Sequence, residues 1–422
     1  MPVCQLSHAS RSWHPAAWRE LPVTQQPAWP DPGRLREVAA RLAASPPLVP
    51  TDQVRALRQA LARVAEGAAF IVQAGDCAET LDIPGLDEVT AKVDLVQDMA
   101  RTVAPAAGCP VVCIGRIAGQ YAKPRTSPTE RVDGREVPAF RGYLVNSPEP
   151  TVASRVPDPT RLLRGYQHSR AVHEMLHKLG RRPAAVHPAD QPALWTSHEA
   201  LVLDYEEPLV RLDPATARWV LTSAHLPWIG LRTSAADGAH VAFLSGVINP
   251  VGCKIGPDAT PAGVVELCRR LDPDREPGRL ILICRMGADQ VAHRLPPVVA
   301  AVTSAGHPVA WVCDPMHGNT RVTDDGRKTR QLTAVLEELR GFFTAVRGAG
   351  AWPGGVHLEA TPEDVTECLG GRPPVTEQDL PRRYTTVCDP RLSPHQTKEV
   401  ARRVAELCQA GRPRAAQGRK SR

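Results

Sequence analysis

Several features that would point to other classes of protein are missing from this sequence. No apolar run is long enough to cross a membrane, and the start of the chain lacks the continuous apolar core of a signal peptide. Aromatic residues make up only 4% of the 422 residues. None lies among the basic residues of 411–422, so the base stacking that single-stranded nucleic acids require is missing there. We therefore expect neither a membrane nor a nucleic-acid partner.

The cysteines and glycines lack the spacing of common metal and nucleotide sites. Eleven cysteines, an odd number, are scattered through apolar segments, which is typical of reduced thiols in a cytoplasmic protein. Cys109 and Cys113 have no matching second pair, which argues against a zinc ribbon. Gly348 and Gly350 begin a G-x-G pattern, but Pro353 stands at the third glycine position, and there is no P-loop. An open, doubly wound nucleotide-binding sheet is therefore the less favoured fold.

What the sequence has instead is an alternation of short apolar runs with amphipathic helical segments. A strand followed by a helix predicts a parallel sheet with crossover connections. Eight such strands predict a (β/α)8 (TIM) barrel of the α/β class. We expect helices after Thr260, after Gly326 and after Ser393. The eight expected strands are 69–76, 111–116, 195–201, 224–230, 253–257, 280–285, 309–314 and 355–359.

The chain divides into three parts: an N-terminal extension of arm and helices (1–65), a catalytic barrel (66–410) and a basic, disordered tail (411–422). Residues 1–35 are rich in proline and tryptophan, which predicts an extended arm lying on the folded body. Residues 34–65 show the periodicity of helices. The formal net charge of +6 suits anionic ligands, although part of it lies in the tail.

The residues that follow the apolar runs carry the chemistry, because a barrel places its functional groups at the carboxyl ends of its strands. One group combines a thiol, an imidazole and two carboxylates. Mixed ligands of this kind suit a divalent transition metal such as Mn²⁺, Co²⁺, Fe²⁺ or Zn²⁺. No local spacing supports the group, so a buried thiol, a loop histidine and solvated carboxylates remain the alternative. The four residues are Cys77, His317, Glu359 and Asp389.

A second group consists of cations at the same strand ends. Basic residues on a solvated face are the ordinary explanation for such a set. Lys254 and Arg285, however, lie on or at the end of apolar strands, where an unpaired cation is costly to bury. A ring of cations at this place predicts anionic substrates, because guanidinium groups match phosphate and carboxylate. The set is Arg116, Lys123, Arg125, Arg232, Lys254 and Arg285.

All residues of both groups except Arg232 fall within blocks that run in order over nearly the whole chain, with Arg285 in the short block RMG (285–287). The blocks include WRELP (18–22), QAGDCAE (73–79), GRIAGQYAKPRTSPTE (115–130), TSHEALVLDYE (196–206), SAHLPWIG (223–230), NPVGCKIGP (249–257), CDPMHGNT (313–320), GGVHLEATPEDVTECLGG (354–371) and YTTVCDPRLSPHQ (384–396). In these blocks the sequence closely resembles the class II 3-deoxy-heptulosonate 7-phosphate (DAHP) synthases. Ordered blocks of this length are far more specific than a single motif.

The resemblance implies a homodimeric barrel enzyme that condenses phosphoenolpyruvate with erythrose 4-phosphate and releases phosphate, the first step of the shikimate pathway. It implies a divalent metal, Mn²⁺ or Co²⁺ with Fe²⁺ or Zn²⁺ as alternatives, on Cys77, His317, Glu359 and Asp389. Phosphoenolpyruvate would be held by Arg116, Lys254, Arg285, Arg232 and the backbone of Leu231. The aldose phosphate would meet Lys123, Arg125 and Thr126. The catalytic residues would be Lys254, which also handles a proton, Cys77 and His317.

Three departures from the family pattern bear on the reaction. Leu231 stands where the family has glutamate, and Tyr143 stands where it has aspartate. The stretch between Asn146 and Trp195 is short, so we expect no regulatory helices for aromatic amino acids. Two other functions therefore stay open: a sister synthase that takes an amino- or imino-substituted aldose phosphate, and a silent paralogue that serves as a regulatory subunit. The presence of all four proposed ligands argues against the silent paralogue.

Overall fold

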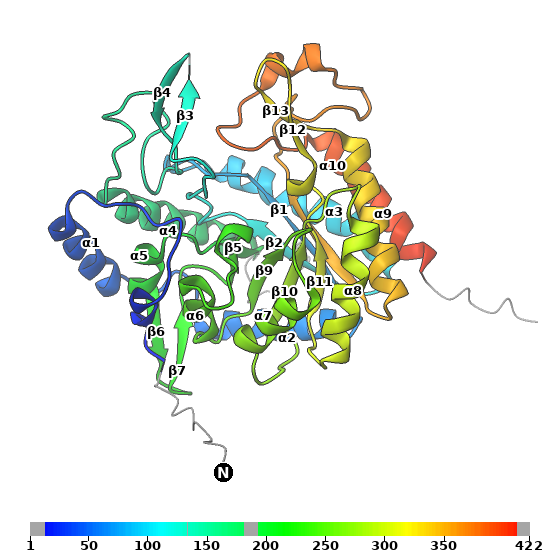
Figure 1. Ribbon diagram of the computed structural model, residues 1–422, viewed down its shortest axis with the longest axis horizontal. Coiled ribbons are helices and arrows are strands. Elements are labelled where there is room, and N and C mark those ends of the chain that lie inside the picture. The colour runs from blue at the N-terminus through cyan, green and yellow to red at the C-terminus, as the bar shows by residue number, and fades with distance from the viewer. Residues whose placement is uncertain (1–12, 133, 181–192, 412–422) are drawn as a thin grey trace, which may run out of the picture.

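A closed barrel of parallel strands forms the centre of the computed structural model, which describes residues 13–132, 134–180 and 193–411 (Figure 1). Around the barrel the strand order is β1-β14-β11-β10-β9-β8-β5-β2. Each of the eight expected runs overlaps one of these strands, so the predicted (β/α)8 barrel is confirmed. The strands are β1 Phe70–Gly75, β2 Val111–Arg116, β5 Trp195–Glu199, β8 Leu226–Ile229, β9 Val251–Ile255, β10 Leu280–Cys284, β11 Ala310–Cys313 and β14 Pro353–Glu359.

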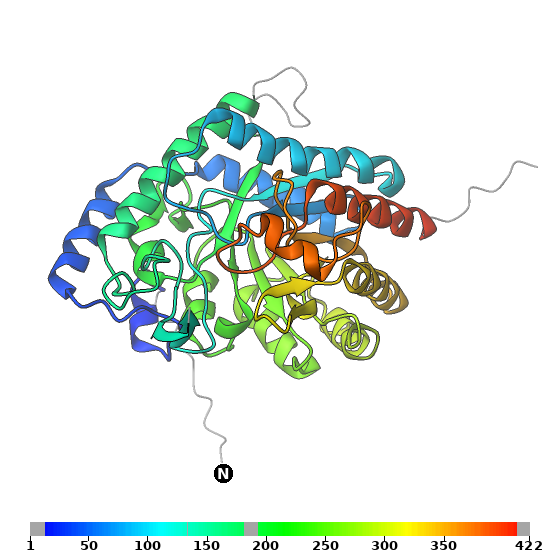
Figure 2. The ribbon, with the colours of Figure 1, turned by 90° about the horizontal axis from the view of Figure 1, so that it is seen from above.

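Helices surround the barrel and cover its outer face, as the view from above shows (Figure 2). Two of the predicted helix starts have the expected caps. Thr260 accepts a hydrogen bond from the Gly263 amide before α7, and Ser393 forms a capping box with Gln396 before α10. The helices are α3 Leu86–Ala107, α4 Thr160–Gly180, α5 Leu203–Glu206, α6 Ala239–Ser245, α7 Pro261–Leu271, α8 Val291–Ser304, α9 Leu332–Gly348 and α10 Pro394–Ala410.

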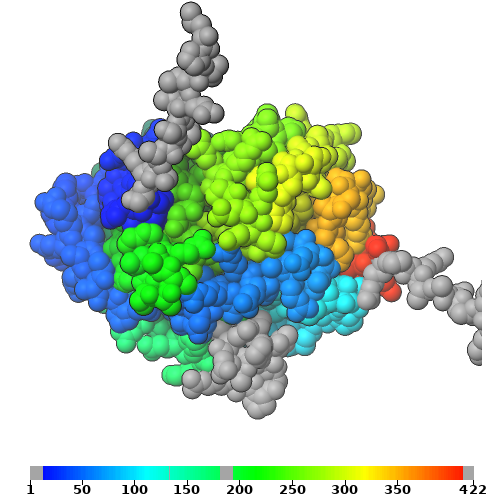
Figure 3. Space-filling view, turned by 90° about the horizontal axis from the view of Figure 1, so that it is seen from below, coloured from blue at the N-terminus to red at the C-terminus, as the bar shows by residue number. Residues whose placement is uncertain are grey.

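The amino end of the barrel is closed by a helix from the N-terminal extension. The helical pattern of 34–65 forms two helices, α1 Pro32–Ala44 and α2 Thr51–Ala65, separated by a proline-rich turn. Leu57, Leu61 and Val64 of α2 pack in one cluster with the inward side chains of the barrel strands. In the view from below, the blue segments that contain this helix run across the face (Figure 3). The extension is thus part of the barrel's core packing.

Three antiparallel hairpins interrupt the strand–helix alternation, and the sequence pattern did not indicate them. Two of them, β3 Thr129–Val132 with β4 Arg135–Pro138, and β12 Thr320–Val322 with β13 Lys328–Arg330, stand at the carboxyl end of the barrel (Figure 1). The third pairs β6 Val210–Asp213 with β7 Arg218–Leu221. Short 3-10 helices complete the fold: η1 Ala17–Glu20, η2 Glu207–Leu209, η3 Leu231–Thr233, η4 His317–Asn319 and η5 Glu377–Arg383.

The described part of the N-terminal arm lies on the body, as predicted. Trp13 donates its indole N–H to the Ala242 carbonyl at 2.9 Å, and Trp18 donates to Glu207 at 2.7 Å. Further along, the Gln25 side chain accepts from the Arg125 amide at 2.8 Å and donates to the Arg125 carbonyl at 3.1 Å. The arm therefore reaches the carboxyl end of the barrel. Apart from Gly411, the predicted tail lies outside the described residues.

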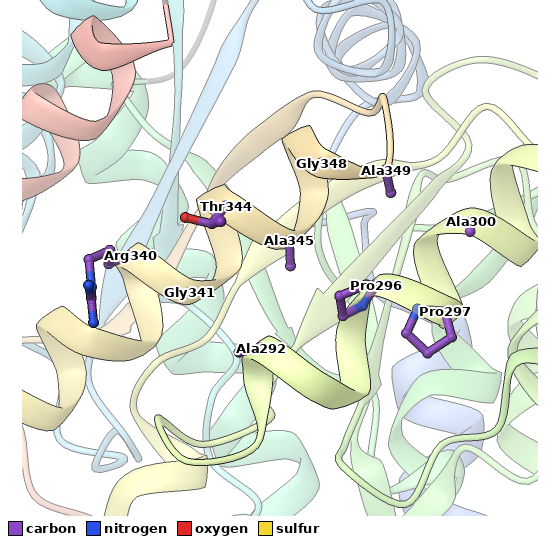
Figure 4. Close-up of a pocket in the computed structure, with 10 residues that line it drawn as sticks. All are labelled: Ala292, Pro296, Pro297, Ala300, Arg340, Gly341, Thr344, Ala345, Gly348 and Ala349. Carbon is purple, nitrogen blue, oxygen red and sulfur yellow. The ribbon is translucent and has the colours of Figure 1, made fainter.

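A cavity of about 720 Å³ lies on the outside of the barrel between α8 and α9 (Figure 4). Its lining consists mainly of small and apolar residues such as Pro296, Pro297 and Ala345, and its one charged lining residue is Arg340. It shares no lining residue with the pocket at the carboxyl end of the barrel. Within the described ranges, no helix is both long enough and apolar enough to span a membrane.

Candidate active site

The carboxyl ends of the strands bring the predicted site residues together in one pocket. Arg116 and Glu359 are the last residues of β2 and β14, and Lys254 lies one residue before the end of β9. The pocket, of about 80 Å³, contains eight of the residues predicted from the sequence. These are Lys123, Arg125, Leu231, Arg232, Lys254, Arg285, His317 and Asp389.

Of the four remaining predicted site residues, Thr126, Arg116 and Glu359 lie close to this pocket, and the fourth is Cys77. Thr126 accepts a hydrogen bond from Arg232 at 2.7 Å. Arg116 is buried below and donates to Glu359 at 3.0 Å and to the Asp76 carbonyl at 3.0 Å. These contacts connect Thr126, Arg116 and Glu359 to the same end of the barrel. The structure thus gathers the predicted residues from distant parts of the chain.

His317, Glu359 and Asp389 form a group that can hold a metal ion. One donor atom from each residue lies within 4.8 Å of the others. Burial opposes ionisation of Glu359, but the positive charges of His317 and Arg330 outweigh it and hold the pKa of this carboxyl well below its usual range. Burial also opposes ionisation of Asp389, but the positive charge of Lys123 outweighs it and lowers the pKa of that carboxyl. Both carboxylates are therefore ionised and suited to a divalent cation.

Cys77 lies beside this group without belonging to it. Its sulfur is 3.1 Å from the Thr386 hydroxyl, and Thr386 donates to the Asp389 carbonyl at 2.8 Å. A hydrogen bond with Cys388 lowers the pKa of the Cys77 thiol to about 7, against the effect of burial, and the charge of Lys123 adds to the lowering. A large fraction of Cys77 is therefore thiolate near neutral pH, the form in which a thiol binds metals.

The loop that carries Asp389 is held by a buried ion-pair network. Arg391 pairs with Asp76 at 2.8 Å and with Glu367 at 2.8 Å. Glu367 also accepts from the backbone amides of Thr386 and Arg391, at 2.8 and 2.7 Å. Because Asp76 directly precedes Cys77, this network fixes the loop after β1 against the loop that follows β14.

Glu359 is surrounded by cations on both of its oxygens. Arg330 contacts one oxygen at 2.8 Å, while Arg116 and the ring nitrogen of His317 lie 3.0 and 3.2 Å from the other. The ammonium of Lys123 lies 3.7 Å from Glu359 and 3.0 Å from Asp389. A positive charge thus already bridges the two carboxylates, which shows that their arrangement suits a cation.

Lys254 and Arg285 are tied to the loop of His317. Lys254 donates to Asp314 at 2.9 Å, and Asp314 also lies 2.8 Å from the His317 ring. Burial lowers the pKa of the Lys254 ammonium, and Arg116 lowers it further, whereas Asp314 raises it. Arg285 donates to the His317 carbonyl at 2.8 Å. Hydrogen bonds therefore link the cations Lys254 and Arg285 to the loop that carries the His317 imidazole.

An indole forms the floor beneath two of these cations. The Trp228 ring centroid lies 5.2 Å from the Arg116 guanidinium carbon and 5.9 Å from the Lys254 ammonium. Cations above an indole face are stabilised by its quadrupole. Trp228 ends no charged or glycine-marked motif of its own, and the sequence pattern assigned it no role.

Several site residues were missed by the sequence reasoning. Arg330 and Lys328 come from the unexpected β12–β13 hairpin, and no sequence signal marked them. Glu199 ends the third barrel strand, so the rule applied to the other strand ends would have found it. One carboxylate oxygen of Glu199 is buried without a hydrogen-bond partner among the described residues, and the residue lines the pocket. A Cβ at Gly230 would lie 1.9 Å from that oxygen, so a larger residue there would displace the end of the Glu199 side chain.

The fold and the site together define a (β/α)8-barrel protein that gathers metal-type ligands and anion-binding cations at the carboxyl end of its strands. Comparison with known proteins gives the family. The model of the class-II DAHP synthetase family matches residues 13–185 and 175–405. The chain therefore belongs to the class II DAHP synthase family.

Similar proteins cover nearly the whole chain. It is 42% identical to the phospho-2-dehydro-3-deoxyheptonate aldolase of Streptomyces coelicolor, over 92% of this chain and 96% of that protein. It is 48% identical to a probable phospho-2-dehydro-3-deoxyheptonate aldolase of Pseudomonas fluorescens, over 88% of this chain and 92% of that protein. The solved structure of the Francisella tularensis enzyme of the same name superposes with a TM-score of 0.54 at 15% identity, over 89% of this chain and 97% of that one. That likeness shows the barrel fold.

Proposed function

We propose that this protein is a metal-dependent DAHP synthase that condenses phosphoenolpyruvate with erythrose 4-phosphate. The observation that carries the proposal is the convergence of three metal-type donors, within 4.8 Å of one another, on a pocket lined by cations. The names of the similar Streptomyces and Pseudomonas proteins support it. In this reaction the enol carbon attacks the aldehyde carbon, water adds to the carbon that bears the phosphate ester, and inorganic phosphate leaves.

The metal that this site would hold is a divalent transition ion, Mn²⁺ or Co²⁺ by preference and Fe²⁺ or Zn²⁺ otherwise. His317, Glu359 and Asp389 would bind it, and Cys77 would join them as its thiolate. When bound, the ion supplies Lewis acidity toward the aldehyde oxygen. A set of one thiolate, one imidazole and two carboxylates is compatible with each of these ions.

The cations of the pocket would bind and orient the two anionic substrates. Arg232 and Arg285, with Lys254 and Arg116, would hold phosphoenolpyruvate, and the backbone of Leu231 would add a donor. Such preorganised charge offsets the repulsion between two phosphorylated substrates and fixes their approach. Lys254 would also carry a proton at its amine nitrogen, because its lowered pKa makes proton release easier.

The aldose phosphate would lie toward the loop that follows β2. Lys123, Arg125 and Thr126 would contact it there, and the hydrogen bonds from Gln25 hold the Arg125 backbone in place. Glu199 would accept a hydrogen bond from a substrate hydroxyl or from the water that adds, because its buried oxygen has no acceptor role elsewhere in the described structure.

One observation favours a second candidate, a synthase for an amino-substituted aldose phosphate. The pocket places the apolar Leu231 where the family has a carboxylate, and it leaves Glu199 free to pair with an ammonium group. Such a substrate would carry an ammonium group that erythrose 4-phosphate lacks. The two candidates differ only in the sugar, so the same assay separates them.

The test is turnover by the purified protein with Mn²⁺ or Co²⁺, phosphoenolpyruvate and erythrose 4-phosphate. Loss of the enol absorbance should match the phosphate released, and both should stop when a chelator is added. Turnover with the amino analogue alone would support the second candidate. Metal binding without turnover of either sugar would refute both and favour the silent paralogue. Undiminished turnover after thorough chelation would contradict the metal dependence.

We also propose that the enzyme works in the cytoplasm as a homodimer. The ten cysteines in the described part of the chain are free thiols, which suits a reducing compartment. Size-exclusion chromatography with light scattering would test the dimer.

A further inference from the structure

A carboxylate on the buried face of α9 lies beneath two of the loops that carry site residues. The Glu338 side chain is fully buried, and none of the ion pairs of the described residues includes it. One of its oxygens accepts hydrogen bonds from the backbone amides of Met286 and Gly287, at 2.8 and 2.9 Å. Its other oxygen accepts from the Asn319 side chain at 2.7 Å. The mechanism proposed above gives this residue no role.

The three contacts connect two separate loops. Met286 and Gly287 directly follow Arg285, at the end of β10, whereas Asn319 lies two residues after His317, in the loop of β11. Asn319 itself accepts from the Ala288 amide at 3.0 Å and donates to the Pro315 carbonyl at 2.8 Å. Glu338 and Asn319 thus form one hydrogen-bonded unit between the two loops.

The two loops are pressed against each other at this point. A Cβ on Gly318 would lie 2.4 Å from the Gly287 amide nitrogen, and Gly287 has a φ of +85°. Such close backbone contact leaves little room for water, so buried amides need an acceptor from the protein. Glu338 supplies that acceptor from below, on a helix that belongs to neither loop.

We propose that Glu338 is a positioning residue that sets the placement of Arg285 relative to His317. The proposal rests on the proposed function, in which Arg285 binds phosphoenolpyruvate and His317 binds the metal. The two groups are already linked by the hydrogen bond from Arg285 to the His317 carbonyl, at 2.8 Å. Glu338 fixes both loops from the opposite side, so substrate and metal are held in one geometry.

The protonation state of Glu338 does not change this role. Burial raises the pKa of its carboxyl to about 8, while the hydrogen bonds from Gly287, Met286 and Asn319 lower it. In the neutral acid, the carbonyl oxygen still accepts from both backbone amides. The hydroxyl oxygen keeps a lone pair for Asn319.

The test is E338Q, with the neighbouring exposed residue in E337Q as the matched control. A glutamine at 338 can still accept from both backbone amides, but its NH₂ group would face the NH₂ group of Asn319. The Asn319 side chain must then turn away and lose its hydrogen bond with the Ala288 amide, in the loop that follows β10. Isothermal titration calorimetry should show that E338Q weakens Mn²⁺ binding and phosphoenolpyruvate binding by about tenfold each, as expected for a buried donor left unpaired. E337Q should match the wild type.

Rescue separates positioning from a general loss of stability. In E338Q/N319D the glutamine NH₂ donates to the new carboxylate, so both affinities should recover at least threefold relative to E338Q. The proposal is overturned if E338Q lowers the melting temperature while both affinities stay unchanged, if only one affinity falls, or if the double variant gives no recovery. Both titrations omit the aldose phosphate. A wild type that binds Mn²⁺ and phosphoenolpyruvate without turnover would therefore refute the proposed function and leave this test intact.

Discussion

Replacing Arg330 by methionine should expose how strongly the site depends on paired charges. The Arg330 and Glu359 side chains are both fully buried, and their ion pair is 2.8 Å long. Arg330 also donates to the Thr320 hydroxyl at 3.1 Å and to the Pro390 carbonyl. Methionine keeps an unbranched side chain but removes the guanidinium group and its charge. The substitution therefore leaves one oxygen of Glu359 buried without a partner.

The expected loss follows from the partners that remain. Breaking a buried ion pair by removing one member costs about 3–5 kcal/mol. Arg116 and His317 still face the other oxygen of Glu359, at 3.0 and 3.2 Å, so its charge stays partly compensated. We therefore expect a decrease of about 3 kcal/mol in the free energy of unfolding, at the lower end of that range. Saturating Mn²⁺ should reduce the difference in unfolding free energy between R330M and the wild type, because a bound cation would compensate the charge of Glu359.

Urea denaturation in chelator and in Mn²⁺ would measure both effects. R321M is the control: Arg321 lies on the same hairpin, but its ion pair with Glu377 is exposed on both sides, with exposed fractions of 45% and 56%. Such surface pairs contribute at most about 1 kcal/mol. If R330M in chelator is no less stable than R321M, the reasoning about the buried pair is wrong.

Three further predictions test other parts of the site. C77A should abolish metal-dependent turnover while the circular dichroism spectrum stays unchanged, and near-normal activity would remove Cys77 from the ligand set. E199Q should lower kcat at least tenfold without altering Mn²⁺ affinity, because its carboxylate is assigned to a hydroxyl or water; an unchanged kcat would contradict that role. Burial raises the pKa of Glu338 to about 8. The contribution of this carboxyl to the free energy of unfolding is therefore complete below about pH 4.5 and is lost as the pH rises through 8. The stability of the wild type relative to E338Q should therefore fall between pH 5 and 9, and a constant difference in unfolding free energy would refute the shift.

The barrel itself could be predicted because its signals are local. Most of the strands are short apolar runs buried on both faces, and a glycine or a charged residue marks their ends. The site residues at those ends followed from the barrel rule, since parallel strands point their carboxyl ends in one direction. Three strands, among them β5, have weak sequence patterns, and they were still placed correctly because a closed barrel of this class needs eight strands.

The residues that support the site were harder to predict, for different physical reasons. Arg330 lies on a three-residue strand of a loop hairpin, so no periodicity marks it, and only the tertiary structure places it against Glu359. Glu338 carried a signal that went unused: it falls in the apolar stripe of α9, between Val335 and Leu339, where a charged residue is out of place. Such an exception in a buried stripe indicates a polar partner that comes from elsewhere in the chain.

The cations of the site fall into two kinds, and the division supports the proposed chemistry. Lys123 and Arg330 contact the carboxylates of the metal-type group, so their charge is balanced within the protein. Arg232 and Arg285, by contrast, have no carboxylate partner in the described part of the chain, and their hydrogen bonds go to a hydroxyl and a backbone carbonyl. Unbalanced guanidinium groups in a pocket attract anions from solution, and their planar donors match phosphate oxygens. The protein therefore pairs the cations around the proposed metal ligands and leaves others for the proposed anionic substrate. A silent paralogue that no longer binds an anionic substrate would have no use for such a division.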